Sequence, residues 1–142
     1  MPGMVVRIGK VSKIDYKKGL ISATYPDLDD AVTDDFPVFS FTDEYKMPKI
    51  GQEILVLHLS NGQSAGIIMG KYWNKDNPPA VYGENVFRKE LAEDPGDCFL
   101  QYRDENLTIQ NGKGDVTFAD GAGNTATLAS ILQRISRLES YH

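Results

Sequence analysis

Residues 53–70, EILVLHLSNGQSAGIIMG, decide the fold that the sequence predicts. Two aliphatic runs flank Asn61 and Gly62, and an Asn-Gly pair between apolar runs favours a tight hairpin of two antiparallel strands. We therefore predict a strand over EILVLHLS, a turn at NGQS and a second strand over AGIIMGKYW.

A second hairpin is predicted upstream, in the segment VVRIGKVSKIDYKKGLISATYP. Val6, Ile8, Val11 and Ile14 give this segment a partial apolar alternation, and LISATY starts the return strand. The turn falls at DYKKG, where Gly19 is free to adopt a positive φ.

The stretch FPVFSF predicts a further strand, with Phe36, Val38 and Ser40 on one face. Pro37 has no backbone N–H to donate, which favours a sheet edge or a bulge. With a turn at MPKIGQ, residues 5–73 contain five short strands and no convincing helix. This pattern is typical of a small barrel or sandwich.

Composition narrows the class of protein. The chain has 142 residues, which predicts one domain with an appendage, and its net charge is −5. It has no apolar run of about 18 residues and no apolar N-terminal segment, so we expect neither a membrane span nor a secretory signal. Residues 26–44 carry seven acidic and no basic side chains. Such a stretch repels a phosphate backbone, so we expect no nucleic-acid partner.

The segment after the barrel changes character. Asn74–Asp97 contains the pair Pro78-Pro79 and is read as a linker, with room for a short strand or helical turn around NVFRKELAE. Three short alternating runs follow, CFLQYR, NLTIQ and DVTFAD, and NGKG joins the last two as a hairpin. A hairpin of this size is marginal alone and needs a partner surface.

The last segment predicts a helix of about 16 residues that starts at Asn124 or Thr125, both good N-cap residues. Its apolar residues recur at spacings of three and four and form a seam, with Leu132 beside it. The seam residues are Leu128, Ile131, Ile135 and Leu138. Two heptads do not make a stable isolated coiled coil. The helix therefore either folds back on its own barrel or associates with copies of itself.

No pattern of catalytic residues is found, and we predict that the protein is not an enzyme and binds no cofactor and no metal. His58 and His142 lie far apart in the sequence, Cys98 is the single cysteine, and the aspartates of residues 27–35 lack the spacing of a calcium loop. Tyr72 and Trp73 end a strand, where they favour capping of a barrel end or an interface over stacking on bases or sugars.

Residues 7–79 resemble the barrel of contractile-tail central spike proteins, the phage baseplate assembly protein V family. Type VI secretion spikes and R-type bacteriocin spikes are related. The resemblance rests on the order of PKIGQEILV, GIIMGKYWNKDNPP and the upstream GKVSKIDYKKGLISATYPDLDD. The barrel-end and linker motif residues are Gly66, Gly70, Tyr72, Trp73, Asn77, Pro78 and Pro79.

The resemblance implies a mainly β fold with a five-stranded oligonucleotide/oligosaccharide-binding (OB) barrel at residues 1–79. It also implies a linker at 80–97, a short trimeric β-helix or β-prism at 98–123 and an amphipathic helix at 124–142. Three chains would bury their apolar residues together on a threefold axis. The expected trimer core is Leu100, Leu107, Ile109, Val116, Phe118, Leu128, Ile131, Ile135 and Leu138.

The resemblance further implies a structural role in the baseplate of a virion or phage-tail-like particle. Such a protein is made in the bacterial cytoplasm and released by lysis. The implied partners are two further copies of the chain, the hub and tail-tube proteins, a separate tip protein, and the target envelope in passing. Family features that this sequence lacks are an apical His-x-His iron site and an inserted lysozyme-like domain. The alternative is an OB-fold binding module for single-stranded nucleic acid or a glycan.

Overall fold

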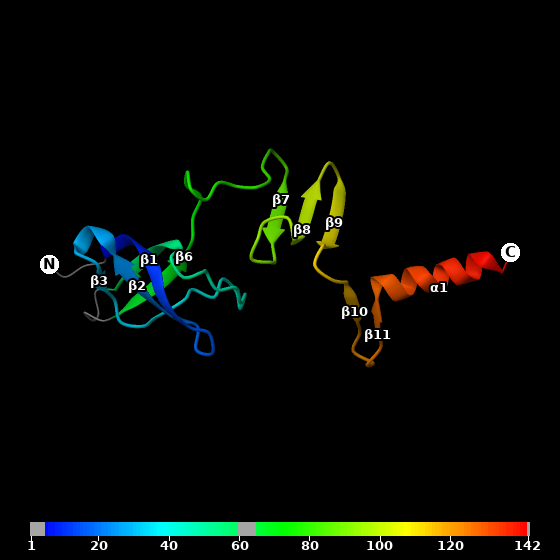
Figure 1. The fold of residues 1–142 in the computed structure, drawn as a ribbon, viewed down its shortest axis with the longest axis horizontal. Helices are drawn as coiled ribbons and strands as arrows, with labels where there is room; N and C mark the ends of the chain where they lie inside the picture. Colours follow the sequence, from blue (N-terminus) through cyan, green and yellow to red (C-terminus); the bar gives the residue numbers. More distant parts are fainter. Residues whose placement is uncertain (1–4, 60–64, 142) are drawn as a thin grey trace. The chain divides into compact units, whose positions relative to one another are not determined.

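The computed structural model describes residues 5–59 and 65–141 and is mainly β, with one α-helix near the C-terminus (Figure 1). The chain divides between Pro78 and Pro79 into two compact units. Within the described residues, no helix is both long enough and apolar enough to cross a membrane.

The N-terminal unit is built on one six-stranded sheet with the order β3-β2-β1-β5-β6, in which β4 also pairs with β2. Its strands and one short 3₁₀ helix are β1 (Val5–Asp15), β2 (Leu20–Tyr25), η1 (Pro26–Leu28), β3 (Ala31–Val32), β4 (Phe36–Pro37), β5 (Glu53–His58) and β6 (Gly66–Gly70). Both predicted hairpins are present, because β1 pairs antiparallel with β2 and β5 pairs antiparallel with β6. The predicted NGQS turn lies outside the described residues.

The core of this unit comes from alternate residues of the central strands. Its largest fully buried side chains are Phe36, Ile21, Ile54, Ile68 and Val56. Val11 is also buried and Ile14 packs against the same cluster, although the two are three residues apart. A register shift between Val11 and Lys13 turns both side chains inward.

The first half of β1 carries its aliphatic side chains on the side away from the core. Gly9 and Val11 point into the core, so Val6 and Ile8 lie on the other side of the strand, with exposed fractions of 56% and 42%. Gly9 occupies the inner face because a Cβ there would lie 2.9 Å from ring carbons of Tyr25.

The strand predicted over FPVFSF is shorter than expected and covers only Phe36 and Pro37. Val38 continues as a single parallel bridge to Ile68 of β6, and Phe39 N–H donates to the Ile68 carbonyl at 2.8 Å. Ser40 is exposed, and positive φ angles at residues 41–43 end the extended path. The segment 36–39 therefore hydrogen-bonds to β2 on one side and to β6 on the other.

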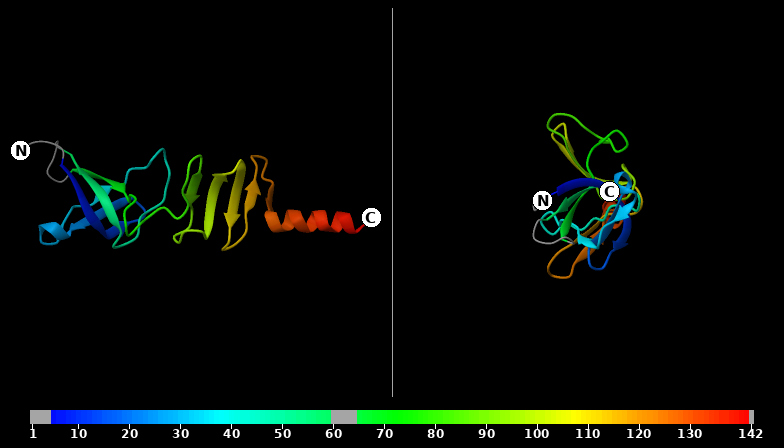
Figure 2. Two further views of the ribbon diagram at one scale, coloured as in Figure 1. Left: turned by 90° about the horizontal axis from the view of Figure 1, so that it is seen from above. Right: turned by 90° about the vertical axis from the view of Figure 1, so that its left-hand side faces the viewer.

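The C-terminal unit contains a three-stranded antiparallel sheet, β7 (Phe87–Glu90), β8 (Cys98–Arg103) and β9 (Asn106–Asn111), with β8 in the middle (Figure 2). The stretch predicted as a linker at 80–97, with a short strand or helical turn open around NVFRKELAE, thus contains the strand β7. On one face of this sheet, Arg88 of β7 donates a hydrogen bond to Gln101 of β8 and forms an ion pair with Glu90. The hydrogen bond links the two strands.

The remaining strands pair differently from the prediction. β10 (Thr117–Ala119) pairs with β11 (Thr125–Thr127) and not with β9, because the turn that closes a hairpin is at residues 120–124. Asp120 builds that turn by accepting from the backbone N–H groups of Ala122 and Asn124.

The helix α1 spans Leu128–Ser140, and its N-cap is Thr127 instead of the predicted Asn124 or Thr125. The Thr127 hydroxyl accepts from the Ser130 N–H at 3.1 Å. Residues 125–127 are extended because they hydrogen-bond to β10, and this pairing moves the start of the helix beyond them.

Candidate functional site

The C-terminal unit has almost no core of its own. Among its described residues, Phe99 is the one buried side chain, with an exposed fraction of 9%, and no residue of α1 is buried. Monomeric soluble proteins rarely leave large connected apolar patches exposed. The exposed apolar residues of this unit are therefore the candidate functional site.

On one face of the three-stranded sheet, the polar side chains form hydrogen bonds and an ion pair with one another. The Arg88 guanidinium lies over the Phe99 ring, 3.4 Å from its centroid, and donates a hydrogen bond to Gln101 Oε1 at 2.7 Å. Arg88 also pairs with Glu90, whose Oε1 accepts from the Gly96 N–H at 2.7 Å. Side-chain exposures of 12% for Arg88 and 19% for Glu90 show that this polar cluster shields the ring.

The opposite face of the same sheet is apolar and uncovered. The strand register places Phe87, Tyr102 and Leu107 in one cross-strand row and Lys89, Leu100 and Ile109 in the next. Leu107 is 73% exposed and Ile109 is 53% exposed, although both sit in a regular strand. The polar side chains of the first face already have hydrogen-bond and ion-pair partners. The second face is therefore the one whose apolar side chains would gain from contact with another surface.

The hairpin β10–β11 and the helix α1 also carry exposed and half-buried apolar side chains. Phe118 lies opposite Ala126 and is half exposed, and Val116 is half-buried. The apolar stripe of α1 consists of Leu128, Ile131, Leu132, Ile135 and Leu138, of which only Ile131 is half-buried.

We define the C-terminal apolar surface as these exposed and half-buried residues: Phe87, Leu100, Tyr102, Leu107, Ile109, Val116, Phe118, Leu128, Ile131, Leu132, Ile135 and Leu138. It contains all nine residues of the expected trimer core. Sequence reasoning missed Phe87, because its segment was read as a linker, and Tyr102, whose alternation with Leu100 was the signal that could have found it.

The residues of the barrel-end motif shape the end of the sheet in the N-terminal unit. Gly66 faces the ring of Phe36, which a Cβ at this position would overlap, and Gly70 has a φ of +102°. Tyr72 OH donates to Glu53 Oε1 at 2.6 Å, and this hydrogen bond raises the pKa of Tyr72. Trp73 is 65% exposed.

Asn77 closes the motif. Its Nδ2 donates to the Tyr72 carbonyl at 3.0 Å, and its backbone exchanges two hydrogen bonds with Asn74. Pro78 is exposed and Pro79 is half-buried. The motif thus ends the sheet in a defined turn before the C-terminal unit begins.

His58 is a packing residue in the structure. Its Nε2 is 2.5 Å from Tyr25 OH, and its ring meets Phe36 edge-on at 5.4 Å between centroids. Burial, with a smaller contribution from Arg7, lowers the pKa of His58, and burial raises the pKa of Tyr25 to about 12. Both groups are therefore neutral at pH 7.

A scan against protein-family models found no match, and a search of curated protein sequences found none. In the described part of the chain, no three His, Cys, Asp or Glu side chains are grouped so that they could hold a metal ion.

Proposed function

We propose that the protein is a homotrimeric structural component, the central spike or hub of a contractile injection particle such as a phage tail or a phage-tail-like bacteriocin. The observation that carries the proposal is the C-terminal unit, in which one described residue is buried while the apolar side chains of one sheet face and of the helix stripe are exposed or half-buried. A single chain leaves these residues in water, and three chains would bury them together.

The energy available from association supports this reading. Complete burial of one aliphatic or aromatic side chain contributes roughly 1.5–3 kcal/mol. Exposed fractions of 66–73% at Leu138 and Leu107 leave most of that contribution unused in one chain. The spacing of three, four and three in α1 suits a seam between parallel helices around an axis.

The N-terminal unit is proposed to be an OB-type five-stranded barrel. The supporting observation is the path of its hydrogen bonds, which runs from β1 through β2 to residues 36–39, on to β6 and β5, and back to β1. A sheet that closes in this way leaves few free edges. The C-terminal strands are proposed to form a short trimeric β-helix or β-prism.

The particle context rests on the resemblance of residues 7–79 to contractile-tail spikes. In that context the partners are the hub and tail-tube proteins, with a separate tip protein beyond the short C-terminal unit. The role is baseplate assembly and puncture of the envelope, and the protein is made in the bacterial cytoplasm and released by lysis. Strands shared between chains resist forced unfolding, because no chain can separate alone.

The test is the molar mass in solution, measured by light scattering after size exclusion, for the full chain and for residues 1–78. We expect the full chain at three times 15.8 kDa and the shortened chain at a lower multiple of its own mass. A full chain that stays monomeric at high concentration contradicts the proposal.

A matched pair of variants locates the interface. Ile109→Asp places a charge on the apolar face of β9 and should abolish the trimer, since burial of unpaired charge is very unfavourable. Gln110→Asp adds the same charge to the polar face one residue later and should leave the trimer intact. Equal effects of the two changes would mean that the apolar face is not the contact.

A further inference from the structure

The N-terminal unit carries an exposed aliphatic surface of its own. The pairing of β1, β5 and β6 aligns Val6 with Leu57, Ile8 with Leu55, and Leu57 with Ile67. Together with Met69 these side chains form the outer aliphatic face: Val6, Ile8, Leu55, Leu57, Ile67 and Met69.

The outer aliphatic face is separate from the core. The core lies on the other side of the same strands, where Ile54, Val56 and Ile68 are fully buried. Val6, Ile8 and Met69 are 56%, 42% and 41% exposed, and the other three are half-buried. Sheet strands that are apolar on both faces are typical of sheets covered on both sides.

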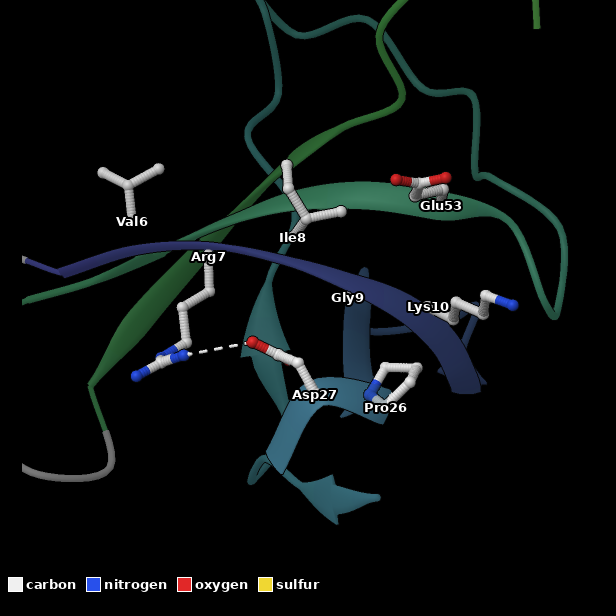
Figure 3. A pocket seen from close by; sticks show the side chains of 8 residues that line it. All are labelled: Val6, Arg7, Ile8, Gly9, Lys10, Pro26, Asp27 and Glu53. Atoms are coloured by element: carbon white, nitrogen blue, oxygen red, sulfur yellow. Dashed lines mark ion pairs between the residues drawn. The ribbon is translucent and has the colours of Figure 1, made fainter. Parts of the chain in front are cut away.

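The border of the outer aliphatic face is hollowed and charged. Val6 and Ile8 line a concavity of about 490 Å³ that also contains Lys10 and Glu53. Figure 3 shows both aliphatic side chains on one side of β1 and Arg7 on the other, where it pairs with Asp27 at 3.7 Å. Lys10 lies on the outer face by register, opposite Glu53, and Lys71 directly follows β6.

A second surface of the same unit has the complementary composition. Leu28 at the end of η1 and Val32 in β3 are 40% and 61% exposed. Three exposed carboxylates lie close to them in the sequence: Asp29 and Asp30 between Leu28 and Val32, and Asp34 two residues after Val32. None of the three makes an ion pair with a described residue. We call Leu28, Asp29, Asp30, Val32 and Asp34 the acidic corner.

We propose that the outer aliphatic face of one copy packs against the acidic corner of the next copy, head to tail around the threefold axis. Each surface offers exposed aliphatic side chains, and the lysines that border the first match the carboxylates of the second. Two copies of the outer aliphatic face set against each other would instead bring Lys10 and Lys71 of both chains together. A head-to-tail contact between two different patches closes into a ring, as a trimer requires.

This inference rests on the proposed trimer. The C-terminal apolar surface holds three chains together, and each N-terminal unit is tethered to that assembly through Pro78 and Pro79. Tethering raises the effective concentration of the N-terminal units for one another, so that a modest contact between them forms.

The test is chemical crosslinking of the full chain with Cys98→Ser, which removes the native thiol. Chains that carry Ile8→Cys are mixed with chains that carry Val32→Cys, exchanged into mixed trimers and treated with a short bismaleimide. We expect a covalent dimer from the mixture and none from either variant alone. Tyr16→Cys, at a position that is 61% exposed and outside both surfaces, is the control partner for Ile8→Cys and should give no product.

The outcomes separate this inference from the proposed function. A trimeric molar mass without the Ile8–Val32 product contradicts the head-to-tail contact and leaves the proposed function standing. A covalent dimer from Ile8→Cys alone means that two outer aliphatic faces meet, which also contradicts it. A monomeric molar mass contradicts the contact and the trimer together.

Discussion

At the scale of single residues, Gly66 determines how closely β6 approaches Phe36. A methyl group at this position would overlap the ring of Phe36, which is itself buried in the core. Gly66→Ala should therefore destabilise the N-terminal unit by about 1–3 kcal/mol, the usual effect of overpacking. The measurement is the urea midpoint of unfolding. Gly121→Ala is the control, because an added Cβ there has no neighbour within 4 Å.

His58 gives the N-terminal unit a pH dependence of known sign. Its pKa lies below the ordinary value of 6.5 in the folded chain, because the ring is partly buried beside Tyr25 and near Arg7. As the pH falls below 6.5, the unfolded chain binds a proton that the folded chain does not, so the free energy of unfolding decreases. The contribution of His58 is complete above pH 6.5 and is lost toward its lower folded pKa.

The measurement is the urea midpoint at a series of pH values between 8 and 5, for the wild type and for His58→Gln. We expect the decrease between pH 6.5 and 5 in the wild type only. A decrease of the same size in both proteins would assign the effect to other groups. Asp35, whose pKa is lowered by hydrogen bonds from Ser22 and Lys13, acts in a separate window below 3.8.

At the scale of elements, the start of α1 can be tested directly. Thr127→Ala removes the hydroxyl that accepts from Ser130 N–H and should reduce helix stability by about 1 kcal/mol, seen as a loss of helical circular dichroism. Thr125→Ala changes one of the two residues that the sequence predicted as N-cap, and it should leave the helix signal unchanged. The reverse result would place the helix start where the sequence pattern predicted it.

The same elements show what could be predicted from the sequence. The two hairpins of the N-terminal unit were predicted correctly, because alternation and Gly or Asn-Gly turns are local signals. The predicted helix start was wrong because Thr125 is a good N-cap by type, but it is the first residue of β11 and lies opposite Ala119 of β10. Around NVFRKELAE the sequence left a short strand or a helical turn open, and the structure has the strand β7 there. The sequence could not decide between them because the partner strand β8 lies beyond a seven-residue loop, and contacts such as that of Arg88 with Gln101 follow no local pattern.

At the scale of the whole molecule, the candidate site was largely predictable, because the sequence shows apolar alternation in a segment that is too short to form a core around it. Leu107, Ile109 and the seam of α1 alternate correctly yet belong to a segment too small to bury them. Val6 and Ile8 show the limit of this reasoning. Val6, Ile8 and Ile14 share one alternation in the sequence, but the register shift after Val11 puts Ile14 on the inner side, while Val6 and Ile8 stay outside. A bulge reverses the two faces of a strand and leaves no trace in a count of apolar residues.

Phe118→Asp tests whether the trimer depends on the C-terminal unit while the N-terminal unit folds independently of it. The side chain is half exposed in β10, so Phe118→Asp removes no core contact within one chain. In a trimer it would bring three carboxylates together in an apolar contact, which is very unfavourable. We expect a monomeric molar mass by light scattering, with an unchanged urea midpoint for the N-terminal unit. Ala119→Asp, on the opposite side of the same strand, should stay trimeric. A trimer that survives Phe118→Asp would show that β10 faces solvent in the assembly, and the interface would then lie on β7–β9 and α1 alone.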